Sequence, residues 1–193
     1  MAEERNLHLK LAGAEVLGLI MIAWATFVVA MIGLKVIDFD ALGATLAMVA
    51  TVSTYVGVGL LLATLVSFLN ENMLLTAAFG ILAFFFLAFP GFATTGAAAM
   101  YATIFVGIAL LLLTVVAFMQ PVKLLPILLL VAAILFFVLG AWLNEPAKLN
   151  TSDMRMIVGI FSLLVFLISV YMAAAIGLLT MKGKPILPLL ITK

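Results

Sequence analysis

Six long apolar runs divide the chain, and each is long enough to cross a lipid bilayer. They cover residues 11–34, 42–68, 73–89, 96–118, 124–143 and 156–180. The hydrocarbon core of a bilayer is about 30 Å thick, so a spanning helix needs roughly 20 mostly apolar residues. Hydrophobic residues make up 68% of the 193 residues, which is more than a soluble domain of this length could bury. The pattern predicts a single all-α integral membrane domain over residues 1–193.

The six runs are predicted to be helices joined by short loops. Their hydrophobicity is continuous, whereas the strands of a membrane barrel alternate over about 10 residues. Asn70–Asn72 forms a short polar turn, and Pro90 with Gly91 is predicted to end the third helix. The longest connection runs from Asn144 to Arg155 and contains Thr151–Asp153, a predicted N-cap for the sixth helix. The short loops make neighbouring helices antiparallel, so we expect an antiparallel bundle.

Basic residues predict which way the bundle faces. Six spans put both termini on one side of the membrane, together with Arg5, Lys10, Lys123, Lys182, Lys184 and Lys193. The other side carries Lys35, Lys148 and Arg155. Because cytoplasmic loops are enriched in Lys and Arg, we expect both termini in the cytoplasm.

Composition excludes several functions. The chain has no cysteine and a single histidine, His8, so disulfides, thiol catalysis and histidine-built metal sites are not expected. A net charge of +1 gives no basic face for a nucleic acid. We find no nucleophile–base pair, metal-ligand set or cofactor motif, so the sequence predicts neither an enzyme nor a cofactor.

Few polar residues lie inside the spans. Glu15, near the start of the first span, is a candidate proton carrier, because an acid in a membrane helix is often functional; it could equally reach headgroups or water. Hydroxyl residues, including Thr26, Tyr55, Tyr101 and Tyr171, could line a pathway for a small solute. The alternative is that they hydrogen-bond between helices or to the carbonyls of their own helix.

The C-terminal end carries a family resemblance. Tyr171–Ala173, Leu178 and then residues 183–188, Gly-Lys-Pro-Ile-Leu-Pro, resemble the close of the acetate/succinate uptake family, the GPR1/FUN34/YaaH group. Leu17, Gly18 and Leu19 resemble part of that family's signature in the first helix, and Leu75–Ala77 resembles its opening of the third. Length, number of spans and short loops agree, and the bacterial form of the tail motif suggests the cell membrane of a prokaryote.

The resemblance implies a transporter or channel for small organic acids such as acetate or succinate. It also implies a pore inside each subunit and a homo-oligomer, a hexamer in the family. An ungapped match places the family's narrow hydrophobic ring at Ile22, Ile81 and Ala132, where no aromatic residue remains. We therefore expect these three residues to form a dry constriction, with hydroxyl residues such as Thr26 and Tyr101 lining the vestibules.

Two other functions stay open. A channel for neutral solutes of the urea or amide kind also has six spans, and the lack of a cation deep in the spans suits it. A non-transporting membrane assembly subunit would use its polar residues only for helix packing. An echo between residues 68–70 and 118–120 is interpreted as coincidence in a chain of such low complexity.

Overall fold

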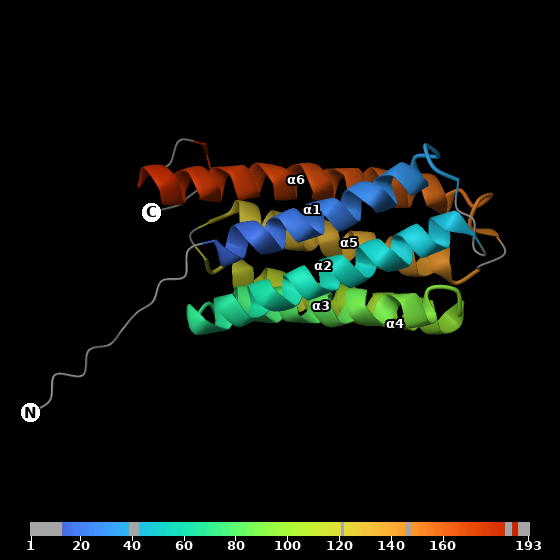
Figure 1. Cartoon of the computed structure of the whole chain (residues 1–193), viewed down its shortest axis with the longest axis horizontal. Helices are drawn as coiled ribbons and strands as arrows, with labels where there is room; N and C mark the ends of the chain where they lie inside the picture. The colour runs from blue at the N-terminus through green and yellow to red at the C-terminus, as the bar shows by residue number, and fades with distance from the viewer. Residues whose placement is uncertain (1–12, 39–42, 121, 146–147, 184–186, 189–193) are drawn as a thin grey trace, which may run out of the picture.

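The chain folds into six long helices. A computed structural model describes residues 13–38, 43–120, 122–145, 148–183 and 187–188. The helices are α1 (Ala14–Gly33), α2 (Ala44–Leu69), α3 (Met73–Phe92), α4 (Ala97–Ala117), α5 (Leu124–Leu143) and α6 (Met154–Lys182). All six are long and apolar enough to cross a membrane. They lie side by side and alternate in direction, so α1 begins at the end of the bundle where α6 finishes (Figure 1). The predicted all-α membrane fold is confirmed.

Five of the six helices have ends that lie one to three residues from the predicted ends, and two of these ends show a physical reason. Pro90 was expected to end the third helix, but α3 continues through it to Phe92. Proline lacks an amide donor, which removes one hydrogen bond of the helix; the next turn still closes, because the Ala93 amide donates to the Phe89 carbonyl at 2.9 Å. Before α6, Asp153 occupies the N-cap position without a side-chain cap, and Ser152 Oγ instead accepts from the Met154 amide at 3.2 Å.

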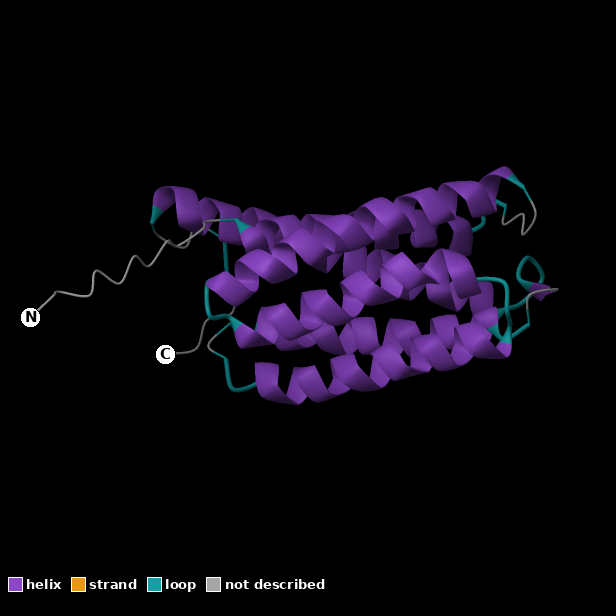
Figure 2. Cartoon of the chain, turned by 60° about the horizontal axis from the view of Figure 1, so that its bottom comes forward, coloured by secondary structure: helices purple, strands orange, loops and turns teal. Residues whose placement is uncertain are grey.

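The six helices form a closed ring made of three closely packed pairs. The most extensive contacts join α1 to α6, α2 to α3 and α4 to α5, and smaller contacts join α1 to α2, α3 to α4 and α5 to α6. The helices make up almost the whole drawn body, with the connecting loops gathered at its two ends (Figure 2). The interior of this ring is therefore enclosed by helix faces rather than by loops.

A buried glycine lets the two helices of each pair approach closely. A Cβ atom built on Gly57 of α2 would lie 2.7 Å from Leu87 of α3, and one on Gly107 of α4 would lie 3.1 Å from Phe137 of α5. In the third pair the backbones themselves meet, since a Cβ on Gly159 of α6 would lie 2.7 Å from the carbonyl carbon of Gly33 in α1. Small residues at such crossings allow close packing of helices within a membrane.

The helix pairs α2–α3 and α4–α5 have similar sequences at a constant spacing of 50 residues. Residues 56–74 and 106–124, which are 50 residues apart, carry the same residue at positions 56, 57, 60, 61, 62, 64, 66, 68 and 74 of the first segment. The echo between residues 68–70 and 118–120 lies within this longer similarity. Val158 and Gly159 of α6 repeat the Val-Gly step found at residues 56–57 of α2 and 106–107 of α4.

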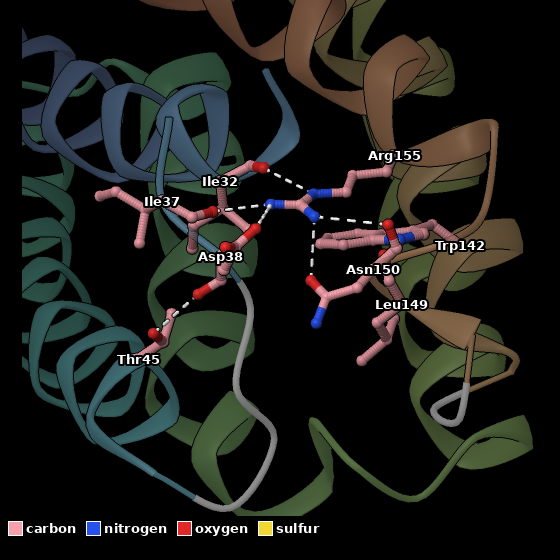
Figure 3. A network of polar contacts seen from close by, with 8 residues as sticks. All are labelled: Ile32, Ile37, Asp38, Thr45, Trp142, Leu149, Asn150 and Arg155. Carbon is pink, nitrogen blue, oxygen red and sulfur yellow. Dashed lines mark hydrogen bonds and ion pairs between the residues drawn. The ribbon is translucent and has the colours of Figure 1, made fainter. Parts of the chain in front are cut away.

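Arg155 joins α6 to the C-terminal end of α1 at the end of the bundle away from the termini. Its side chain is 2% exposed, and Nε donates to the Ile32 carbonyl at 2.8 Å while Nη2 donates to the Ile37 carbonyl at 2.7 Å (Figure 3). Nη1 donates to Asn150 Oδ1 at 2.9 Å. Asp38 lies 3.5 Å from Nη2, but its carboxylate is 90% exposed, so that ion pair contributes little. The guanidinium therefore ties the start of α6 to carbonyls at and just after the C-terminal end of α1.

Candidate functional site: a two-chamber interior pathway

The ring encloses a cavity of about 160 Å³. It extends from the end of the bundle that holds the chain termini to about the middle of the helices. Its wall comes from α1, α3, α4, α5 and α6, and most of the lining side chains are apolar. Gln120, which is exposed, lies at one end of this lining, whereas Leu135 and Phe136 at the other end are buried. The cavity thus opens toward the surface at the end where Gln120 lies.

The residues that line the cavity on α1, α3 and α5 recur at constant spacings along the chain. Leu19, Phe79 and Leu129 are separated by 60 and 50 residues along the chain, and all three line the cavity. Because α1, α3 and α5 start at the same end of the bundle, residues related by these spacings lie at similar depths. The same spacings give three further levels of lining residues: Glu15 with Leu75 and Leu125; Ile22 with Leu82 and Ala132; Thr26 with Phe86 and Phe136.

A second cavity of about 50 Å³ continues along the same helices. Val29, Phe89 and Leu139 line it, and they continue the same register. Ile32 and Trp142 line it near the far end of the bundle, where the Trp142 indole donates to the Leu149 carbonyl at 2.8 Å. The two cavities therefore follow one another along the interior of the ring.

Phe86 lines both cavities and separates them. It belongs to the level that also holds Thr26 and Phe136. Phe85 packs edge-on against Phe136 with ring centroids 4.9 Å apart, and its ring lies 5.5 Å from that of Phe86. Such aromatic contacts stabilise a fixed arrangement of the rings. The barrier between the chambers is thus aromatic, and Thr26 is the polar residue at its level.

The hydroxyl of Thr26 already uses its hydrogen-bond donor within its own helix. Its hydroxyl donates to the Ile22 carbonyl at 2.8 Å and lies 3.2 Å from the Ala23 carbonyl. A hydroxyl has one donor and two acceptor lone pairs. Because the donor is used within α1, Thr26 can only accept a further hydrogen bond, so this level suits a solute that carries its own N–H or O–H group.

Polar side chains gather where the larger cavity reaches the surface. Glu15 and Asn72 are half-buried there, and Asn72 Nδ2 donates to Glu15 Oε1 at 3.2 Å. Asn72 also caps α3, since its Oδ1 accepts from the Leu75 amide at 3.3 Å. Gln120 completes this group, which we call the polar mouth: Glu15, Asn72 and Gln120. The carboxylate of Glu15 is therefore held at the opening by an amide of α3.

Positive charge is scarce along this pathway. Among the described residues that line the two cavities, Glu15 is the single ionisable side chain. Lys123 lies near the polar mouth, but its ammonium donates to the carbonyls of Phe118 and Gln120 at 2.7 and 3.0 Å. Arg155 lies beyond the second cavity and donates to three residues as described above. A bare anion would find no cationic partner among the described lining residues, so this lining favours neutral molecules.

The structure brings together four of the residues predicted for the site. Glu15, Ile22, Thr26 and Ala132 all line the larger cavity. Ile81 packs half-buried against the core and lines neither cavity; Leu82 stands at its level instead. An α-helix turns about 100° per residue, so Ile81 and its neighbour Leu82 point in different directions. Leu82 is on the face of α3 that lines the cavity.

The predicted tyrosines lie elsewhere. Tyr55 and Tyr101 are 62% and 66% exposed on the outer helices α2 and α4. Tyr171 donates its hydroxyl to the Pro188 carbonyl at 2.9 Å and so attaches the chain that follows α6 back onto that helix. None of the three is among the residues that line the cavities. Thr51 and Thr54 of α2 donate to carbonyls of their own helix, the alternative considered for the hydroxyl residues.

Sequence reasoning missed Phe86, Phe136 and the amides of the polar mouth. The 50-residue register was the available signal, since it relates the lining faces of α3 and α5 position by position. No group of three His, Asp or Glu side chains within the described ranges lies close enough to hold a metal ion.

The fold is shared with a channel of known structure. The structure described as that of the bacterial acetate channel SatP superposes on this chain with a TM-score of 0.76, covering 94% of this chain and 99% of that one, at 17% sequence identity. This likeness confirms, at the level of the fold, the resemblance to the acetate/succinate uptake group. No protein-family model matches the sequence, and no curated protein matches it.

Proposed function

We propose that this membrane protein conducts small organic acids such as acetate or succinate through the interior of its helix ring. The two cavities in series, separated at Phe86, carry the proposal. The likeness to an acetate channel supports it, since the two chains share the fold over almost their whole lengths. The solute enters at the polar mouth, passes Ile22 and Ala132 in the wide chamber and crosses the aromatic level of Thr26, Phe86 and Phe136.

The aromatic level acts as the gate of this route. Narrow hydrophobic segments of a pore exclude water and so resist the passage of ions. We place the gate one helical turn deeper than the ring expected at Ile22, Ile81 and Ala132, because Ile22 and Ala132 border open space. Rotation of the Phe86 side chain would join the two chambers without moving any helix. We further propose that the protein forms a homo-oligomer with one pathway per subunit and has its termini in the cytoplasm.

The charge of the pathway bears on the form of the acid that crosses. Glu15 at the mouth repels a second carboxylate, and the described lining residues offer no cation to compensate. The acid therefore crosses in its protonated form, with Glu15 as the group that can exchange its proton. The same lack of a cation favours a second candidate function, a channel for neutral solutes such as urea or small amides.

Uptake into liposomes tests the proposal. We would reconstitute the purified protein and measure entry of labelled acetate against protein-free vesicles, because protonated acetic acid crosses lipid unaided. The Ala132→Trp variant fills the wide chamber and should abolish protein-dependent entry, whereas Ala141→Trp, at an exposed position of the same helix, should not. Equal flux in the two variants would remove the pathway assignment.

Competition distinguishes the candidate functions. Inhibition of acetate entry by propionate or succinate supports the organic-acid channel. Protein-dependent urea entry that acetate does not inhibit supports the neutral-solute channel. Absence of protein-dependent entry for every solute would favour the assembly subunit.

A further inference from the structure

The larger cavity is more apolar and more spacious than acetate needs. Its volume is about 160 Å³, and an apolar cavity of about 150 Å³ engineered into another protein stays dry and binds benzene. Below the polar mouth the wall consists of leucine, isoleucine, valine, methionine, phenylalanine and alanine side chains, with Thr26 at its inner end. The two carbon atoms of acetate would leave most of this wall without contacts.

Two features of this chain produce the space. Ala132 contributes only a methyl group at the level where Ile22 and Leu82 face it. Gly18 lets the Phe79 ring lie against the α1 backbone, since a Cβ on Gly18 would clash with that ring. The ring therefore lies against α1 instead of projecting across the chamber. Both small residues widen the cavity at adjacent levels.

We propose that this cavity is a binding site for a neutral molecule with a compact hydrocarbon body of about benzene size and a hydrogen-bonding head, the natural case being an aromatic or cyclic monocarboxylic acid in its protonated form. The inference deepens the proposed function and rests on it for the acid. The hydrocarbon body occupies the space beside Ile22, Ala132 and Phe79, where burying apolar surface is favourable. The head group lies at the polar mouth.

The hydrogen bonds of the mouth fit such a head. Asn72 Nδ2 donates to Glu15 Oε1, which leaves Glu15 Oε2 to accept the O–H of a carboxylic acid. The amide of Gln120 can donate to the carbonyl oxygen of the same ligand. The charged groups described at this end of the bundle are Glu15, Glu71, Lys123 and Lys182; of these, Glu15 lines the cavity, and Lys123 is engaged by backbone carbonyls. An ionised ligand would meet the Glu15 carboxylate, so the neutral form binds.

The test compares ligands that differ in one property at a time. Benzamide and acetamide are neutral at every working pH and differ in the size of the body. Binding to the purified full-length protein in detergent is followed by ligand-observed NMR, with protein-free micelles as the blank. We expect benzamide to bind at least tenfold more tightly than acetamide. Benzoic acid should bind at about pH 4.5 and lose at least tenfold in affinity at about pH 7.5, as its carboxyl group ionises.

A variant of α5 localises the binding. Ala132→Phe should reduce benzamide affinity at least tenfold by filling the chamber, and Ala141→Phe, at an exposed position of α5, should leave it unchanged. Equal affinities for benzamide and acetamide, or benzamide binding that survives Ala132→Phe, would overturn the inference.

Acetate flux, measured after the same purified proteins are reconstituted into liposomes, separates this inference from the proposed function. If the protein conducts acetate but binds benzamide no more tightly than acetamide, the site for a large hydrocarbon body is refuted and acetate transport still stands. Benzamide binding that Ala132→Phe abolishes, in a protein that conducts no acid, supports the site and refutes the transport proposal.

Discussion

A single methyl group added at Gly159 tests how closely α1 and α6 are packed. In the structure a Cβ at this position would lie 2.7 Å from both the Gly33 carbonyl carbon and the Leu34 nitrogen. Ordinary contacts of a Cβ begin near 3.4 Å, so the two backbones must separate by several tenths of an ångström. Backbone atoms cannot rotate away as the end of a flexible side chain can. The Gly159→Ala variant must therefore move α6 away from α1.

The sign of the change in stability follows from one favourable and two unfavourable contributions. Alanine is favoured over glycine inside a helix by about 1 kcal/mol. Overpacking of a well-packed contact costs about 1–3 kcal/mol, and the separation also lengthens the 2.8 Å hydrogen bond from Arg155 to the Ile32 carbonyl, worth about 1 kcal/mol. We therefore expect a net loss of roughly 1–3 kcal/mol.

Gly91→Ala is the matched control. Gly91 lies in the last turn of α3, and a Cβ there would meet no atom within 4 Å. The same substitution at this position keeps the gain in helix propensity without the clash, so its free energy of unfolding should rise by up to about 1 kcal/mol.

Thermal unfolding in one detergent and at one scan rate measures both variants. For a chain of this length about 1 kcal/mol shifts the midpoint by roughly 2–4 °C. The midpoint of Gly159→Ala should fall by about 2–12 °C, and that of Gly91→Ala should rise by up to about 4 °C. An unchanged or raised midpoint for Gly159→Ala would refute the backbone contact between α1 and α6.

Three further substitutions test the far end, the gate and the mouth. Arg155→Met removes the hydrogen bonds to the Ile32 and Ile37 carbonyls and to Asn150, so it should cost about 2–4 kcal/mol of unfolding free energy, seen as a lower midpoint; wild-type stability would contradict the role of the guanidinium. Phe86→Ala should join the two chambers and speed acetate entry into liposomes, at a cost of about 2–4 kcal/mol in stability; unchanged or slower entry in the folded variant would place the gate elsewhere. Glu15→Gln keeps an acceptor for Asn72 but cannot exchange a proton, so the pH dependence of uptake should disappear; an intact pH profile would rule out the proton role.

The helices could be predicted from the sequence because the membrane imposes one requirement on every span. A backbone in lipid must satisfy its own hydrogen bonds, so a long apolar run can only be a helix, and α5 was predicted with its observed bounds, 124–143. Pro90 misled the prediction because a proline near a helix end removes one bond and not the whole turn. Only that one hydrogen bond is lost, and the last turn of α3 still forms beyond Pro90.

The lining of the pathway was harder to predict, because hydrophobicity marks no face of these helices. In a soluble helix polar residues reveal the outward side, but here lipid and cavity both contact apolar side chains. Phe84 and Phe86 differ little as residues, yet Phe84 is 67% exposed and Phe86 lines both chambers. An error of one residue rotates the face by about 100°, which is how Ile81 was chosen in place of Leu82.

The register between the helix pairs supplies the information that hydrophobicity lacks. A residue that lines the pathway on α3 predicts one on α5 at 50 residues' distance, as Phe86 predicts Phe136. The same register shows where the levels differ: Thr26 is the polar member of the aromatic level, and Glu15 is the charged member of the outermost one. Both exceptions lie on α1. Glu15 and Thr26 each face the apolar side chains that α3 and α5 contribute at the same level. That asymmetry suits an amphipathic neutral acid better than a symmetric or charged solute.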